Sequence, residues 1–253
     1  MAARWPSRLW IVRHGESAGN VARDAAYDRK SALIDIQVRD VDVPLSALGQ
    51  KQAQALGDWF GSLPANERPE VVLTSPYLRA RSTAEAIRAG RGLGPRFKQF
   101  VVDERLREKE LGILDRLTRL GIEQRHPELA ASRQLVGKFY FRPPAGESWC
   151  DVILRLRSVL DTISLHYSNR PVLIVAHQVV VLCMRYLLEN LDEDRILAID
   201  AEGDVANCSI TEYMSEGGSD VRAMTLKKYN FVAPLEEAEA SVTAAPDRNV
   251  GAR

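Results

Sequence analysis

The chain has 253 residues, and its 34 Lys plus Arg balance 34 Asp plus Glu, so the formal net charge is zero. This balance argues against nucleic acid or an anionic membrane surface as a partner, and any bound anion must be held by local groups. Three cysteines without metal-ligand spacing and the lack of a long apolar run favour a reduced, cytoplasmic protein without a transmembrane segment.

Short apolar runs alternate with helical patterns along the chain. The runs are residues 9–12, 70–74, 97–103, 171–176, 208–213 and 222–229. Apolar residues also recur at helical spacing between 152 and 163, after a Ser148-x-x-Asp151 capping pattern. The alternation predicts an α/β fold with a mainly parallel sheet and helices on both faces.

Two segments fit neither pattern. Residues 21–43 have mixed polarity and no sustained period, so we expect a long surface excursion between the first strand and a helix opened by Ser46. Residues 234–253 are poor in large apolar residues, which predicts a disordered C-terminal tail. The folded domain is therefore expected to span residues 1–233.

Four of the apolar runs are followed by polar residues. The first run leads into Arg13 and His14, the second into a segment with Arg79, the third into one with Glu108, and the fourth into His177. In open parallel sheets the ligand site lies outside the carboxyl ends of the strands. We therefore expect these five side chains to converge there.

Each of these residues also has an ordinary structural interpretation. An isolated histidine after an apolar run is usually structural, and His126 and His166 keep that interpretation. Arg79 alone would more often be a solvated helix residue, and Glu108 stands in a charge-rich run. Only their joint position after strands favours a functional site.

The motifs resemble, in order, those of the histidine phosphatase superfamily, in the branch that includes the cofactor-dependent phosphoglycerate mutases. Arg13-His14-Gly15-Glu16-Ser17 with Asn20 is similar to R-H-G-x-S-x-x-N, and "TSPYLRARSTAEA" to T-S-x-L-x-R-A-x-x-T-A. The segments "PLSALGQKQA", "LREKELG", "PAGESWCDV" and "VLIVAH" resemble further family motifs. The resemblance implies a phosphoglycerate mutase-like three-layer fold.

The resemblance also implies a role for each matched residue. His14 is similar to the nucleophile that becomes a phosphohistidine, and His177 to a second histidine that is cationic beside the phosphoryl group. Glu108 matches the acid that protonates the leaving oxygen, for which its pKa must be raised. The phosphate-binding residues of the family match Arg13, Asn20 and Arg79. Because guanidiniums supply the positive charge, we expect neither a metal nor an organic cofactor.

The sequence departs from two groups of relatives. It lacks the tryptophan that usually precedes Asn20 in the mutases, and also their paired arginines, which favours hydrolysis over phosphoryl return. Residues 139–148 and 172–178 resemble fructose-2,6-bisphosphatase domains. Yet Ala145 and Leu182 stand where those domains have a lysine and an arginine.

The leading hypothesis is a metal-independent phosphatase that hydrolyses a phosphate monoester of a small metabolite through a phosphohistidine on His14. The alternatives are mutase-type phosphoryl transfer, a fructose-2,6-bisphosphatase-like activity, and a non-catalytic phosphate-binding module. Gln178 and Arg142 are candidates for substrate contacts, although a solvated surface arginine is an equally good interpretation of Arg142. The sequence leaves the substrate open, and also whether the chain forms a homodimer.

Overall fold

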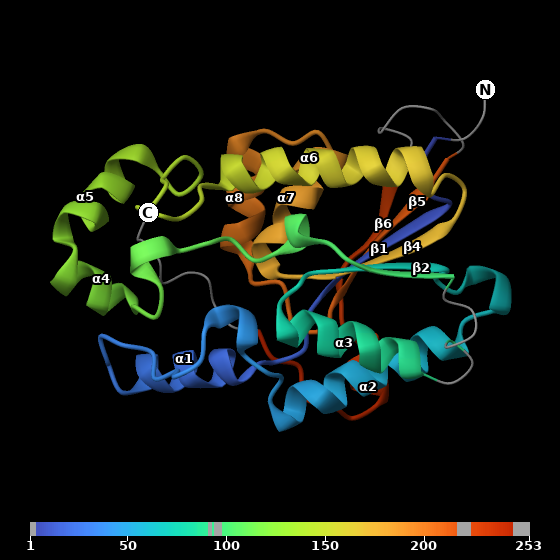
Figure 1. Ribbon diagram of the computed structural model, residues 1–253, viewed down its shortest axis with the longest axis horizontal. Coiled ribbons are helices and arrows are strands. Elements are labelled where there is room, and N and C mark those ends of the chain that lie inside the picture. The colour runs from blue at the N-terminus through green and yellow to red at the C-terminus, as the bar shows by residue number, and fades with distance from the viewer. Residues whose placement is uncertain (1–3, 91–92, 94–97, 217–223, 245–253) are drawn as a thin grey trace.

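The structure is a computed structural model that describes residues 4–90, 93, 98–216 and 224–244 (Figure 1). Within these residues, six strands form one sheet in the order β3-β2-β4-β1-β5-β6. The strands are β1 (Arg8–Arg13), β2 (Val71–Thr74), β3 (Gln99–Val102), β4 (Pro171–Ala176), β5 (Ile210–Ser215) and β6 (Met224–Phe231). The first four are parallel, and β5 and β6 run antiparallel to their neighbours. The predicted α/β class with a mainly parallel sheet is confirmed.

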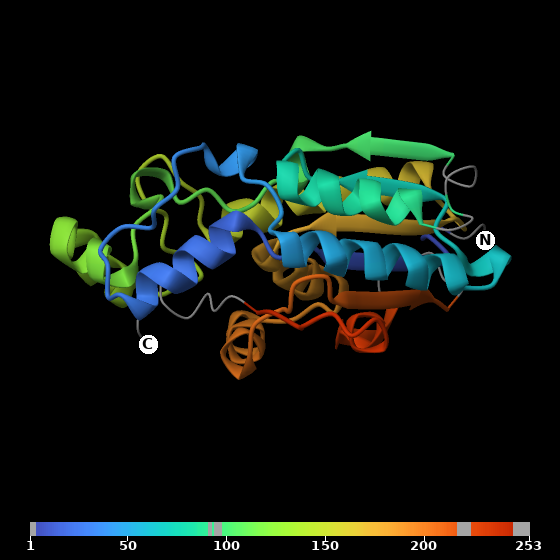
Figure 2. The same cartoon turned by 90° about the horizontal axis from the view of Figure 1, so that it is seen from below.

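Helices cover both faces of this sheet (Figures 1 and 2). The α-helices are α1 (Ala18–Asp28), α2 (Ala47–Ser62), α3 (Leu78–Ala89), α4 (Arg119–Arg125), α5 (Pro127–Val136), α6 (Trp149–His166), α7 (Gln178–Leu188), α8 (Glu193–Glu202) and α9 (Ala233–Glu237). Short 3-10 helices are η1 (Asp40–Asp42), η2 (Ala65–Glu67), η4 (Glu104–Leu106) and η5 (Gly112–Leu114). Helix α6 begins after the predicted cap, where Ser148 Oγ accepts from the backbone N–H of Asp151.

Alternating side chains of the central strand β1 divide the interior into two cores. Leu9 and Ile11 pack with α6 and α7, whereas Trp10 and Val12 pack with α2 and α3. This period of two is what a strand buried on both faces requires. The two cores fix the strand in register, so the residues that follow Val12 leave the sheet at a defined place.

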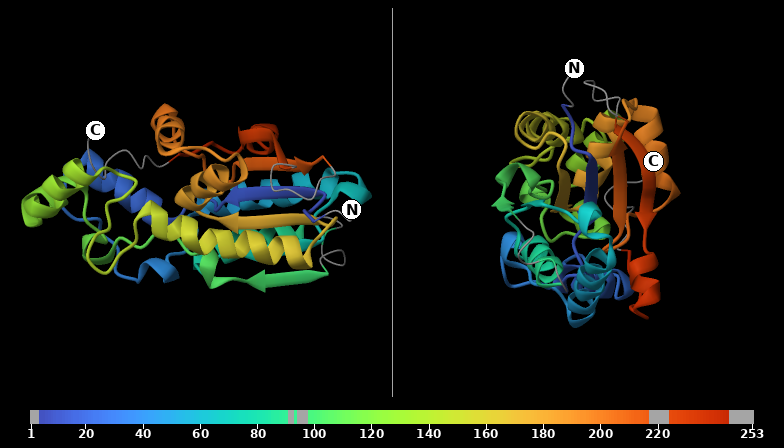
Figure 3. Two further views of the ribbon diagram at one scale, coloured as in Figure 1. Left: turned by 90° about the horizontal axis from the view of Figure 1, so that it is seen from above. Right: turned by 90° about the vertical axis from the view of Figure 1, so that its right-hand side faces the viewer.

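Helices α1, α4 and α5 extend beyond the carboxyl ends of the parallel strands (Figures 1 and 3). The sequence predicted an irregular excursion over 21–43, but α1 already begins at Ala18. The reason is local: Ser17 and Asn20 form a capping box that satisfies the first backbone groups of the helix. Residues 29–39 then return without helix or extended strand to η1.

The segment after β6 differs from the predicted disordered tail. Helix α9 forms, and its Leu235 is fully buried in the core that lies under α2. Further on, the Gln52 amide donates to Ser241 O and Thr243 Oγ1. One buried leucine and these hydrogen bonds hold a segment of low apolar content against the domain. Residues 245–253, and the starts of the predicted runs 97–103 and 222–229, lie outside the described residues.

None of the helices in the described ranges combines the length and apolar character needed to cross a bilayer.

Leu235→Ala should lower the free energy of unfolding by about 2–5 kcal/mol, because it removes a buried leucine and leaves a cavity. Equilibrium urea denaturation measures the loss. Val242→Ala is the matched control, because Val242 is 43% exposed and should change stability by less than about 0.5 kcal/mol. Equal, negligible effects of both substitutions would show that the segment after β6 does not pack on the domain.

Candidate active site

The pairing of β1 with β4 brings the two predicted histidines together. Arg13 lies opposite Ala176 in the parallel register, and the backbone N–H of His14 donates to Ala176 O over 2.9 Å. His14 and His177 therefore leave the sheet side by side, with ring centroids 5.1 Å apart. Both side chains are buried. The two histidines that were predicted to converge at the strand ends thus lie side by side there.

The glycine after His14 allows a close approach of two chain segments. A Cβ atom on Gly15 would lie 2.6 Å from Gly49 O, in the first turn of α2. The backbone N–H of Gly15 donates to Thr83 Oγ1 of α3 over 3.0 Å. The loop that carries His14 is therefore packed between α2 and α3, and a larger residue at position 15 would displace it.

His14 is held as a neutral imidazole with one defined tautomer. Its Nδ1 lies 2.7 Å from Gly15 O, and because a carbonyl oxygen only accepts, Nδ1 carries the proton. Its Nε2 accepts from Nε of Arg79 over 3.2 Å. Burial, then the charges of Arg79 and Arg13, hold the pKa of His14 well below its usual value. An unprotonated Nε2 is the form that can attack an electrophile.

Arg13 and the segment before β5 close the other side of the loop. Arg13 is buried at the end of β1 and donates to Val205 O. The Asn207 amide donates to His14 O over 3.0 Å. Asn20 uses its amide oxygen in the cap of α1, where it accepts from the Ser17 N–H. The NH₂ group is then the donor that Asn20 can offer an anion.

His177 lies close to two residues, of which the sequence predicted one, Glu108, and missed the other, Ser75. Its Nδ1 lies 3.8 Å from Oε2 of the predicted acid Glu108. Its Nε2 lies 2.7 Å from Ser75 Oγ, a contact that sequence reasoning missed although Ser75 stands in the same motif as Arg79. Ser75 Oγ already accepts from the Tyr77 N–H, so its own proton can go to His177 Nε2. If the Ser75 hydroxyl donates in this way, the proton of a neutral His177 lies on Nδ1, which has no hydrogen-bond partner within the described residues and stands 3.8 Å from Glu108 Oε2.

The charge of His177 depends on what surrounds its ring. Burial, followed by the charges of Arg79 and Arg13, lowers the pKa of His177 well below its usual value. In the absence of an anion, burial and these two guanidiniums therefore favour the neutral form of the second histidine. A phosphoryl dianion would reverse this balance, because an adjacent negative charge favours the protonated form.

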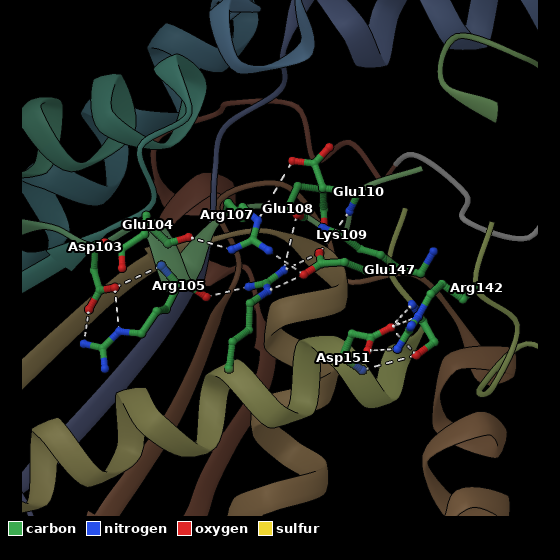
Figure 4. A network of polar contacts seen from close by, with 12 residues as sticks. Asp103, Glu104, Arg105, Arg107, Glu108, Lys109, Glu110, Arg142, Glu147 and Asp151 are labelled. Atoms are coloured by element: carbon green, nitrogen blue, oxygen red, sulfur yellow. Dashed lines mark hydrogen bonds and ion pairs between the residues drawn. The ribbon is translucent and has the colours of Figure 1, made fainter. Parts of the chain in front are cut away.

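A buried ion pair supports the segment that carries Glu108 (Figure 4). Glu147 accepts from Arg155 Nε over 3.0 Å, from Arg107 Nη2 over 2.6 Å and from the Glu110 N–H over 3.1 Å. Arg155 also donates to Glu108 O over 3.3 Å. Burial opposes ionisation of Glu147, but these donors outweigh it and lower the pKa. The sequence matched the segment around Glu147 to a family motif without giving this residue a role.

The two candidates for substrate contacts have protein partners. Gln178 is buried at the start of α7, where its amide donates to Asp204 Oδ1 over 3.1 Å. Arg142 donates to Asp151 from Nε over 2.7 Å, and 62% of its side chain is exposed (Figure 4). This ion pair helps to lower the pKa of Asp151 to about 2. Leu182 is fully buried in the core with α6, so a cation at this position would have to enter that core.

Across the described parts of the chain, His, Cys, Asp and Glu side chains form no group of three or more that could hold a metal ion.

The comparisons with known proteins agree with this geometry. The family model described as "Histidine phosphatase superfamily (branch 1)" matches residues 9–225. The chain belongs to this superfamily. This match confirms the resemblance seen in the sequence motifs, and solved structures similar to the chain include a phosphatase.

Three similar proteins illustrate how far the likeness extends. The bifunctional protein Rv2228c of Mycobacterium tuberculosis is 29% identical over 224 residues, which are 88% of this chain and 55% of that protein. The 6-phosphofructo-2-kinase/fructose-2,6-bisphosphatase of Caenorhabditis elegans is 33% identical over 71% of this histidine phosphatase and 33% of its own length. A native mycobacterial glucosyl-3-phosphoglycerate phosphatase is 27% identical with a TM-score of 0.66, covering 89% of this chain and 99% of that one. The chain spans about half, or less, of the two curated relatives.

Glu147→Ala should lower the free energy of unfolding by about 3–5 kcal/mol, because it leaves the buried charge of Arg155 without its partner. The side chains of Glu147 and Arg155 are only 11% and 10% exposed. Arg142→Ala breaks an exposed ion pair instead and should cost less than about 1 kcal/mol. Urea denaturation of both variants checks the contrast, and similar losses would contradict a special role of the Glu147 pair.

Proposed function

We propose that the protein is a metal-independent phosphatase that hydrolyses the phosphate monoester of a small metabolite through a phosphohistidine at Nε2 of His14. The observation that carries the proposal is the state of this nitrogen. It is buried, unprotonated and 3.2 Å from the guanidinium of Arg79. A neutral imidazole nitrogen beside positive charge suits in-line attack on phosphorus.

The reaction would proceed in two balanced steps. In the first, Nε2 of His14 bonds to phosphorus, the ester P–O bond breaks, and the proton of Glu108 goes to the leaving oxygen. In the second, water attacks phosphorus, its proton goes to Glu108, and the N–P bond breaks to release phosphate and neutral His14. A dianion beside Glu108 supports the first step, because it favours the protonated carboxyl. An acid placed in this way contributes roughly 10²- to 10⁴-fold to the rate.

Positive charge for the transition state would come from side chains. Arg13 and Arg79 are both buried beside His14, and guanidiniums bind phosphoryl oxygens through parallel N–H donors. His177 adds an N–H donor on Nδ1 and gains charge when the dianion is present. These groups supply what Mg²⁺ supplies in other phosphoryl-transfer sites, which supports a reaction that needs no metal.

The substrate would be recognised by a wall built from two distant segments. The backbone N–H of Ile34 donates to Arg116 O over 2.9 Å, and Thr118 Oγ1 donates to Ser31 O over 2.7 Å. Position 145 carries an alanine in place of the lysine of fructose-2,6-bisphosphatase domains. Position 182, where those domains have an arginine, carries a leucine that lies inside the core. These features favour a substrate with one phosphoryl group over fructose-2,6-bisphosphate. The related glucosyl-3-phosphoglycerate phosphatase supports a phosphorylated metabolite as the substrate class.

Brief incubation with ³²P-labelled para-nitrophenyl phosphate in EDTA should place acid-labile, base-stable phosphate on His14. His14→Ala should show neither label nor turnover, and Glu108→Gln should lower kcat by roughly 10²- to 10⁴-fold. Monophosphates should be hydrolysed faster than fructose-2,6-bisphosphate in the same assay. Lack of label on His14 would refute the covalent route. Loss of activity in EDTA would refute the metal independence. Turnover that occurs only when 2,3-bisphosphoglycerate is added would indicate a mutase.

The imidazole of His14 should remain neutral at pH values below 6.5 in the free enzyme. A folded-state pKa below the usual value means that protonation, and with it loss of the nucleophile, is shifted to lower pH. Long-range ¹H–¹⁵N NMR should show an unprotonated Nε2 and a protonated Nδ1 from pH 7.5 down to pH 5.5, with His14→Ala assigning the signal. A midpoint near 6.5 would contradict the electrostatic effect of burial, Arg79 and Arg13.

A further inference from the structure

A carboxylate from the segment between α1 and α2 contacts the same arginine that approaches the nucleophile. Arg79 Nη1 donates to Asp40 O over 2.7 Å and to Asp40 Oδ1 over 2.9 Å, and Nη2 donates to Asp40 Oδ2 over 3.2 Å. The Arg79 side chain is 6% exposed and that of Asp40 45% exposed. Asp40 therefore reaches the site from its solvent side.

The two contacts of Arg79 use different edges of the guanidinium. A planar guanidinium carries two pairs of parallel N–H donors, one across both Nη atoms and one across Nε and the nearer Nη. Asp40 bridges the two Nη atoms and so fills the first pair. The second pair includes Nε, whose N–H donates to Nε2 of His14. The edge that faces the nucleophile is thus the one that Asp40 does not bridge.

We propose that Asp40 is a positioning residue, which holds Arg79 so that its second donor pair faces the phosphoryl group bound at His14. This inference rests on the proposed function, since it needs a phosphoryl group at Nε2. When Nε2 bonds to phosphorus, it no longer accepts from Arg79, and the Nε–H can donate to a phosphoryl oxygen. The guanidinium needs no rotation, because Asp40 keeps the opposite edge.

A second contact restrains the plane of the same guanidinium. The ring of Tyr77 lies 4.9 Å from Arg79 Cζ, and its hydroxyl donates to Glu110 Oε1 over 2.8 Å. Tyr77 limits movement of the guanidinium toward its ring, whereas Asp40 holds the outer edge. An arginine restrained in both ways loses little conformational freedom when the phosphoryl group binds.

The same geometry argues against Asp40 as a simple competitor of phosphate. A competing anion would occupy the donors that face His14, but Asp40 occupies the outer pair. Its negative charge repels a dianion, yet nearly half of the side chain is exposed, so water and salt screen this repulsion. The orientation of Arg79 should therefore outweigh the repulsion. The two effects predict opposite changes when Asp40 is removed, because loss of orientation lowers kcat whereas loss of repulsion tightens phosphate binding.

The test compares Asp40→Ala and Asp40→Asn with Asp42→Asn, a matched control in the same 3-10 helix at an exposed position. With para-nitrophenyl phosphate, Asp40→Ala should lower kcat by roughly tenfold or more, because misplacement of a clamp residue is felt mainly in the transition state. Vanadate, which adopts a five-coordinate geometry, should bind more weakly by a similar factor, while KM and phosphate inhibition change less. Asp40→Asn should be intermediate, and Asp42→Asn unchanged.

A double-mutant cycle separates positioning from loss of folding. In an Arg79→Lys background, Asp40→Asn should have no further effect on kcat, because an ammonium has no second donor pair to orient. Tighter phosphate and vanadate binding with unchanged kcat in Asp40→Ala would overturn the inference, as would additive effects in the cycle. If ³²P labels His14 in the wild type while the Asp40 variants behave normally, this inference fails and the proposed function stands.

Discussion

The parallel pairing of β1 with β4 is the interaction on which the rest of the site depends. It joins Arg8–Arg13 to Pro171–Ala176 in the middle of the sheet, with cores packed on both faces. Because the side chains of β1 alternate between two cores, a shift by one residue would exchange the side chains of these cores and turn His14 away from His177. The same packing that stabilises the sheet therefore sets the spacing of the two imidazoles.

Electrostatics at the strand ends follow from this spacing. Two arginines are buried beside two histidines, and their charges, together with burial, keep both imidazoles neutral. Carboxylates then stand at graded distances from the centre: Glu108 beside His177, Asp40 on the outer edge of Arg79, and Glu147 beneath the Glu108 segment.

The sequence predicted the elements that local patterns encode. Apolar runs identified the strands, and the Ser148-x-x-Asp151 pattern identified the start of α6. The convergence of Arg13, His14, Arg79, Glu108 and His177 followed from their places after the strands. Other features depend on contacts between distant residues. Asp40 lies in a segment without hydrophobic periodicity. The role of Ser75 is visible only from its contact with His177, which is distant in the sequence. Leu235 is a single buried leucine in a segment of mostly polar and small residues.

The central position of β1 has a consequence for synthesis on the ribosome. Within the described residues, β1 pairs only with β4 and β5, so the apolar run Leu9–Val12 stays without a sheet partner until Pro171–Ala176 has left the exit tunnel. At roughly 5–20 residues per second, this interval lasts on the order of ten seconds. During that time an apolar strand with unpaired edges is open to chaperones and to aggregation. His14 and His177 thus cannot come together in the sheet until Pro171–Ala176 has been translated.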